Sequence, residues 1–173
     1  GAAGLGKLLD SVLYRPSGSL CDEVVIGWNG TGDGPETLSA RAVAGAPLAW
    51  PAGVALKIVK QEWRDDFAQA RQECFEAASG VWRAYLDSDD RLSMPEGDAA
   101  VDRNLLAARS SRSEATHGES LRGYLQRLAP DNNMVWLPYD YLTDPEGRVY
   151  VRTWRCRIVR WADGWCWNAA VHE

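Results

Sequence analysis

Arginine and tryptophan alternate near the end of this chain in a pattern that suits recognition of a partner. Arg155, Arg157 and Trp161 fall at odd positions of one β-prone segment, and Asn168 and His172 follow on the next one. A guanidinium group forks onto carboxylates or phosphates and stacks on rings, while an indole supplies a large contact area. We expect these five residues to form a partner-binding surface, with an ordinary solvated sheet face as the alternative.

A second aromatic set is typical of a ligand pocket with one polar anchor. It consists of Trp63, Phe67, Trp154, Arg160 and Trp167. Four rings would line such a pocket, and the arginine would hold the polar end of a ligand. A closed hydrophobic core produces the same sequence pattern and is the commoner outcome, so the pocket is the alternative hypothesis.

Two glycine-containing motifs resemble binding loops only in outline. Residues 1–7 have the spacing of a phosphate-binding loop, but Leu8 stands where a metal-binding Ser or Thr is required. Residues 29–34 alternate oxygen-bearing side chains before a glycine, as calcium loops do, but Ala40 occupies the position of the bidentate glutamate. We therefore reject a phosphate-binding loop at residues 1–7 and interpret residues 29–34 as an ordinary glycine turn.

The other reactive side chains do not form a catalytic or metal-binding pattern. Neither His117 nor His172 lies in a motif with a nucleophile and a carboxylate. The four cysteines contain no C-x-x-C pair, which favours free thiols in a reducing compartment such as the cytoplasm. We therefore predict no catalytic residue, no metal and no cofactor. An acidic cluster, for which a bound cation is the alternative to a solvated surface, comprises Asp87, Asp89, Asp90, Glu96 and Asp98.

Length and composition indicate a single globular domain over residues 1–173. The chain is 46% hydrophobic and 25% charged, and no apolar run approaches the roughly 18 residues of a membrane span. The net charge of −5 argues against nucleic acid as a partner. The first residue is Gly1 rather than methionine, so a removed targeting segment and a cloning scar both stay open.

Hydrophobic periodicity predicts an α+β fold that positions these residues. Apolar side chains recur every three or four positions over residues 54–85, which predicts one long amphipathic helix. Alternation over residues 134–142, 148–161 and 165–172 predicts an antiparallel meander of three or more strands packed on that helix. Shorter helices are expected at 4–14, 98–110 and 118–128, and shorter strands at 23–28 and 38–43.

Strand alternation also divides the nine tryptophans between roles. A turn at residues 163–164 places Trp154, Trp165 and Trp167 on the face that packs against the helix, and Trp161 on the opposite face with Arg155 and Arg157. This tryptophan-rich chain is therefore predicted to use most of its indoles in the core.

These patterns favour a soluble, non-enzymatic protein–protein interaction module or an accessory subunit of a larger assembly. One alternative is an enzyme or small-ligand-binding protein with a pocket between the long helix and the sheet. The other is single-stranded nucleic-acid binding on the Arg155, Arg157 and Trp161 face. The partner and the oligomeric state are not encoded in any motif.

Overall fold

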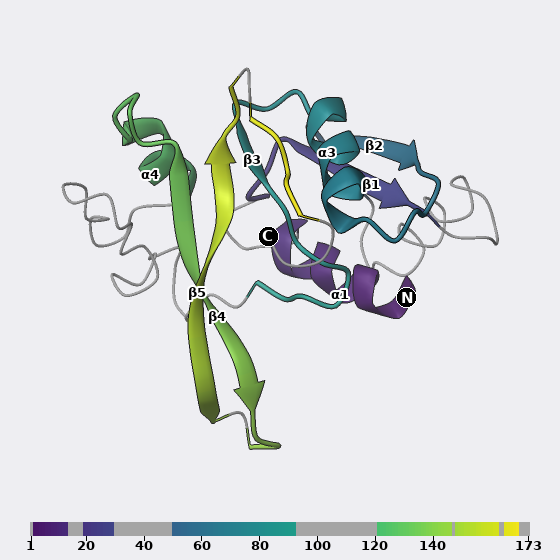
Figure 1. The fold of residues 1–173 in the computed structure, drawn as a ribbon. Helices are drawn as coiled ribbons and strands as arrows, with labels where there is room; N and C mark the ends of the chain where they lie inside the picture. Colours follow the sequence, from purple (N-terminus) through teal and green to yellow (C-terminus); the bar gives the residue numbers. More distant parts are fainter. Residues whose placement is uncertain are drawn as a thin grey trace. The chain divides into compact units, whose positions relative to one another are not determined.

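The computed structural model describes residues 2–13, 19–29, 50–92, 121–146, 148–162 and 165–169. They form two compact units, residues 1–93 with 161–173 and residues 94–160, which we describe one at a time. The described elements are α1 (Ala2–Leu13), β1 (Glu23–Trp28), β2 (Ala55–Lys60), α3 (Phe67–Ala77), β3 (Trp82–Ala84), α4 (Leu121–Arg127), β4 (Met134–Thr143) and β5 (Val149–Arg160), as Figure 1 shows.

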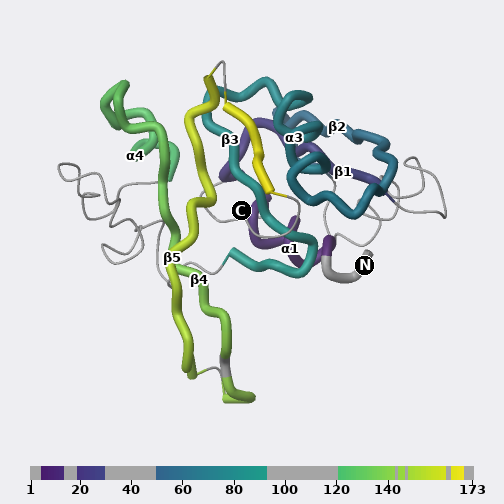
Figure 2. Tube along the Cα trace, viewed as in Figure 1, coloured from purple at the N-terminus to yellow at the C-terminus, as the bar shows by residue number. Residues whose placement is uncertain are grey.

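In the first unit, a parallel pair of strands lies between two helices. β1 and β2 run side by side from Glu23 opposite Ala55 to Trp28 opposite Lys60. Val24 of β1 packs on the buried Leu9 and Leu13 of α1. The opposite pleat of β1, at Gly27, faces α3, because successive residues of a strand point to opposite sides. Figures 1 and 2 show α3 beside this strand pair.

The long helix predicted over residues 54–85 is wrong. This segment forms a strand, a short helix and a second short strand, namely β2, α3 and β3. The carboxylate of Asp66 accepts a hydrogen bond of 2.9 Å from the backbone N–H of Gln69 and thereby begins α3 afresh. Before this cap, β-branched Ile58 and Val59 lie in β2 and pair with β1. Apolar spacing alone did not separate three adjoining elements from one helix.

In the second unit, α4 precedes a long antiparallel hairpin of β4 and β5. Val135 lies opposite Ile158, and both are buried, as are Tyr124 and Leu128 at and just after α4. The pairing shifts register between Val135 and Trp136 and again near Leu142, which indicates bulges. Figure 2 traces the two strands side by side to their turn.

The α+β class is confirmed, whereas the predicted meander is wrong. In the three-stranded sheet the order is β3-β5-β4, so the third strand comes from before the hairpin in sequence. Residues 165–169 are not a strand, and residues 170–173 lie outside the described part of the chain. The strands predicted at 23–28, 134–142 and 148–161 and the helices predicted at 4–14 and 118–128 are confirmed. The elements predicted at 38–43 and 98–110 lie outside the described residues.

The single domain over residues 1–173 stays a prediction. In the structure the chain divides into two compact units. Within the described ranges, each helix is too short or too polar to cross a lipid bilayer.

Gly27 allows α3 to approach β1, which predicts that Gly27→Ala destabilises the protein. A Cβ at this position would lie 2.7 Å from Gln61 Oε1 and 2.8 Å from Cys74 Sγ. Gln61 would have to move and lose its 2.6 Å hydrogen bond to the carbonyl of Ala70. We expect a loss of about 1–2 kcal/mol in the free energy of unfolding, measured by urea denaturation.

Gly6→Ala is the matched control, because Gly6 lies inside α1 and a Cβ there meets nothing within 4 Å. It should stabilise the protein by up to about 1 kcal/mol through helix propensity. Equal effects of the two substitutions would contradict the close packing at Gly27.

Candidate functional site

Arg71 of α3 lies within a group of aromatic rings in the first unit. Its guanidinium carbon is 5.7 Å from the ring centre of Phe67, 4.6 Å from that of Tyr85 and 5.4 Å from that of Trp167. Its Nη2 also forms an ion pair of 3.2 Å with Asp87. Arg71 is therefore held by stacking and by charge at once. We call Arg71, Phe67, Phe75, Tyr85 and Trp167 the α3 aromatic cluster.

Phe75 is the buried centre of this cluster. Its ring centre is 5.2 Å from Trp161 and 5.2 Å from Trp167, and Tyr85 meets Trp167 edge-on at 4.8 Å. The backbone N–H of Trp167 donates a 3.0 Å hydrogen bond to Gln72 Oε1. These contacts fix residues 165–169 on α3, and we call this segment the C-terminal strap.

The five residues predicted to bind a partner are divided by the structure. Arg155 and Arg157 share one face, where their guanidinium carbons lie 5.2 and 5.1 Å from the ring of Tyr139. Arg157 is only 5% exposed. Trp161 packs on Phe75 in the first unit and lies 5.0 Å from the guanidinium of Arg83.

Of the remaining two, Asn168 is exposed on the strap, and His172 lies outside the described residues. Neither Arg157 nor Trp161 is thus a fully exposed contact residue.

Three of the five residues predicted to line a pocket come together. Trp63 and Phe67 stack edge-on at 5.0 Å, and Phe67 and Trp167 both contact Arg71. Arg160 and Trp154 belong to the other unit. There, Arg160 donates a 3.1 Å hydrogen bond to the carbonyl of Leu128. The pocket hypothesis required the long helix, which the structure replaces with shorter elements.

Two residues of the predicted acidic cluster, Asp87 and Asp90, stabilise the loop after β3. Asp87 pairs with Arg71, and the carboxylate of Asp90 accepts a 2.9 Å hydrogen bond from the backbone N–H of Asp87. Glu96 and Asp98 lie outside the described residues. Within the described ranges, no three His, Cys, Asp or Glu side chains are grouped as metal ligands.

The four cysteines are free thiols, and two of them have a raised pKa. Cys21, Cys74 and Cys156 are partly buried and Cys166 is exposed. Burial raises the pKa of the Cys74 thiol, and the charge of Glu73 raises it further. Burial also raises the pKa of the Cys156 thiol. Both shifts lower the thiolate fraction at neutral pH, which is the opposite of what a catalytic cysteine needs.

A polar cluster that sequence patterns did not indicate joins β1, β2 and the end of α3. Lys57 Nζ lies 2.6 Å from Glu23 Oε1 and 2.8 Å from the carbonyl oxygen of Ala77. Ser79 donates to Glu23 twice, from its backbone N–H at 2.7 Å and from its hydroxyl at 3.0 Å. The lysine and serine thus donate to one carboxylate, so this arrangement ties three elements together and does not activate a nucleophile.

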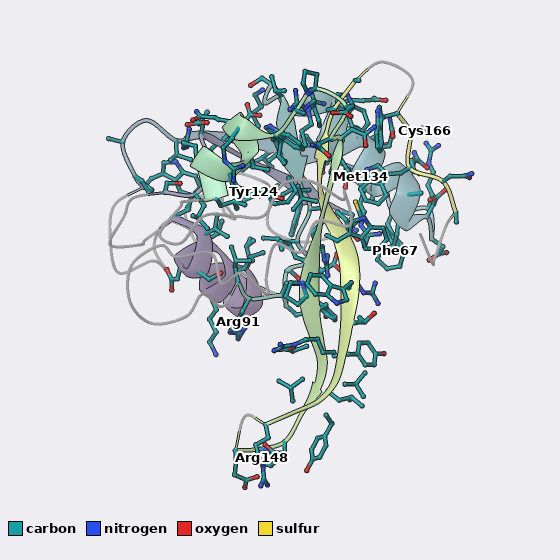
Figure 3. All side chains as sticks on the ribbon, turned by 90° about the vertical axis from the view of Figure 1, so that its left-hand side faces the viewer. Phe67, Arg91, Tyr124, Met134, Arg148 and Cys166 are labelled. Atoms are coloured by element: carbon teal, nitrogen blue, oxygen red, sulfur yellow. The ribbon has the colours of Figure 1, made fainter. Side chains whose placement is uncertain are left out.

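The distal half of the β4–β5 hairpin carries six of the ten large apolar side chains that are exposed in the described residues. We call residues 138–155 the hairpin arm. Six of its residues are exposed, namely Tyr141 (60%), Leu142 (52%), Val149 (38%), Tyr150 (70%), Val151 (42%) and Trp154 (40%). Figure 3 shows side chains on both sides of this hairpin, with Arg148 at its tip and Met134 near its other end.

The charges of the hairpin arm neutralise one another. Arg152 forms a two-pronged ion pair with Asp140 on the opposite strand, with the longer hydrogen bond at 3.1 Å. Arg148 pairs with Asp144 and Glu146 across the turn. Arg155 stacks on Tyr139. The arm therefore presents apolar and aromatic surface with little uncompensated charge.

Comparison with known proteins finds no relative, since no protein-family model, no curated protein and no solved structure matches this chain.

The Glu23 cluster predicts a pH-dependent loss of stability in Glu23→Gln. Burial raises the pKa of this carboxyl, but hydrogen bonds from Lys57 and Ser79 outweigh burial and lower the pKa below its ordinary 4.5. The carboxylate therefore stabilises the fold above about pH 4.5, and this contribution disappears as the pH falls through the lowered pKa. We expect Glu23→Gln to lose about 1–2 kcal/mol at pH 7 and much less near pH 3, measured by urea denaturation.

Glu62→Gln is the control, because Glu62 and its partner Arg64 are 76% and 61% exposed. Such a pair contributes about 0–1 kcal/mol, so its removal should change stability little at either pH. A pH-independent loss in Glu23→Gln would refute the role assigned to its charge.

The strap predicts that Trp167→Ala destabilises the first unit by about 2–3 kcal/mol, because the rings of Phe75 and Tyr85 and the guanidinium of Arg71 lose their partner. Trp167→Phe should lose less than half as much. The indole N–H of Trp167 is buried without an acceptor within the described residues, and phenylalanine keeps a ring while removing that group. Near-UV circular dichroism and thermal unfolding measure both variants.

Asn168→Ala is the matched control on the same strap, because Asn168 is exposed. It should change stability by no more than about 0.5 kcal/mol. A Trp167→Ala variant as stable as Asn168→Ala would show that the strap does not depend on Trp167.

Proposed function

We propose that this chain is a non-enzymatic protein–protein interaction module that presents its hairpin arm to a protein partner. The observation that carries this proposal is the exposure of six large apolar side chains on one two-stranded arm. An exposed apolar patch of this kind is typical of an interaction site, since a monomer gains no stability by leaving it in water.

Backbone geometry supports the same proposal. Two strands alone are marginally stable in water and expose unpaired N–H and C=O groups along their edges. Tyr150 and Trp154 fall on one pleat of β5, and Val149 and Val151 on the other, by strand alternation. A partner that covers the arm would therefore bury apolar side chains on both faces, as an accessory subunit of an assembly does.

The chemistry of the described residues favours this function over the two alternatives. Glu23, Lys57 and Ser79 are engaged with one another, and the pKa values of the Cys74 and Cys156 thiols are raised, so these groups are poor nucleophiles. Nucleic acid binding requires exposed cations that release counterions from phosphates. Here Arg157 is buried, and Arg148 and Arg152 already pair with carboxylates.

The proposal predicts that charges on the arm abolish partner retention. Tyr150→Lys with Trp154→Lys should lose a protein that the tagged wild-type chain retains from native extract, because two lysines would have to be desolvated in the complex. Retained proteins are measured by quantitative mass spectrometry. The variant should keep its far-UV circular dichroism spectrum, since both side chains are substantially exposed.

Val81→Lys provides the control, because Val81 is a 64% exposed apolar residue outside the arm. This variant should retain the same protein as the wild type. Equal retention by the arm variant and the control would show that the arm is not the binding surface.

A further inference from the structure

We infer that the partner of the hairpin arm is the arm of a second copy of this chain, joined along the outer edge of β5 around Trp154. This inference rests on the proposed function of the arm as an interaction surface. Two hairpins paired in this way form a four-stranded antiparallel sheet about a two-fold axis. Each copy then provides hydrogen-bond partners for the unpaired N–H and C=O groups at the edge of the other.

Pro138 establishes which main-chain groups face this edge. Pro138 lies opposite Trp154 in the hairpin and has no N–H to donate. The two residues therefore form a pair that exchanges no main-chain hydrogen bonds, because proline is tolerated only where its N–H would point away from the neighbouring strand. In such a pair, the N–H and C=O of Trp154 point away from β4, to the outer edge of β5.

The two edges of the hairpin differ in their capacity to accept another strand. β4 lacks a donor at Pro138 on its outer side, which blunts that edge. β5 contains no proline. The neighbour of β5 in the sheet order, β3, has only three residues, against twelve in β5. The backbone N–H of Trp161 donates to the carbonyl of Val81, which places the start of β3 beside the residue that follows β5. A strand of three residues can pair with only part of a strand of twelve.

Charge supports a second copy over a partner chosen by opposite charge. The ion pairs of Arg152 with Asp140 and of Arg148 with Asp144 and Glu146 lie within one arm. Two identical arms therefore meet without net repulsion, although the whole chain carries a net charge of −5. A strongly basic or acidic partner would gain little electrostatic attraction from this surface, because its charges are already paired.

The exposed area fits a dimer of moderate strength. A fully covered aromatic side chain buries roughly 150–250 Å². The four exposed side chains of β5 lie beside the pairing edge, namely Val149, Tyr150, Val151 and Trp154. At their exposed fractions they supply on the order of 300 Å² per copy, against roughly 800 Å² per partner in a standard interface. Main-chain pairing adds to this area. We expect dissociation in the micromolar range rather than an obligate dimer.

Sedimentation velocity of the full chain tests the inference. Wild type and the Val81→Lys control should shift from monomer to dimer between roughly 1 and 100 µM, a range in which complexes of moderate affinity assemble. Tyr150→Lys with Trp154→Lys should weaken the association at least about 10-fold, because like charges would approach across the two-fold axis. A wild-type chain that stays monomeric at 100 µM overturns the inference.

Hydrogen exchange measured by NMR identifies the edge that pairs. The amide of Trp154 should become at least about 10-fold better protected at high protein concentration, since it gains an acceptor only in the dimer. The amide of Thr153 points toward β4 and should be protected equally at both concentrations, so it serves as the internal control. A dimer in which the Trp154 amide gains no protection overturns pairing along this edge.

These outcomes separate the inference from the proposed function. A monomeric chain whose arm still retains a different protein refutes the second copy and leaves the interaction role intact. A monomeric chain whose arm variant and control retain the same proteins refutes both.

Discussion

Burial of Phe75 between Trp161 and Trp167 is the interaction on which the organisation of the chain depends. Both indoles come from the end of the sequence, and the Trp167 contact joins residues 95 positions apart, as its hydrogen bond to Gln72 shows. Because Trp161 and Trp167 pack on Phe75, the first unit contains residues from both ends of the sequence, and the second unit comprises residues between them.

The second unit is stabilised differently at its base and at its tip. At its base, Val135, Ile158 and Tyr124 are buried and act as an ordinary core. Toward the tip, burial gives way to exposed cross-strand pairs such as Arg152 with Asp140. The net gain from exposed ion pairs is small, so the shape of the arm is maintained mainly by backbone pairing. The exposed apolar residues toward the tip therefore contribute little to the core of the second unit.

Local patterns in the sequence were sufficient to predict α1, β1, β4 and β5, because each has one periodicity bounded by turn residues. The prediction of one long helix was wrong because Ile58 and Val59 fit the apolar spacing of both a helix and a strand. Only their pairing with β1 decides between the two. Pairing of Arg155 and Arg157 on one face followed from strand alternation. Their contact with Tyr139 and the burial of Arg157 did not, because they depend on the partner strand and its bulges.

The tryptophans show how tertiary packing redistributed the expected roles. Sequence alternation favoured Trp161 as the exposed indole and Trp154 as a core residue. In the structure Trp161 packs on Phe75, whereas Trp154 is 40% exposed beside Pro138. Burial changes along β5, whose side chains are exposed toward Val149 and buried or half-buried toward Arg160, and alternation alone does not reveal this change. Strand alternation assigns a side chain to a face, whereas the packing around each part of the strand decides whether that side chain is exposed.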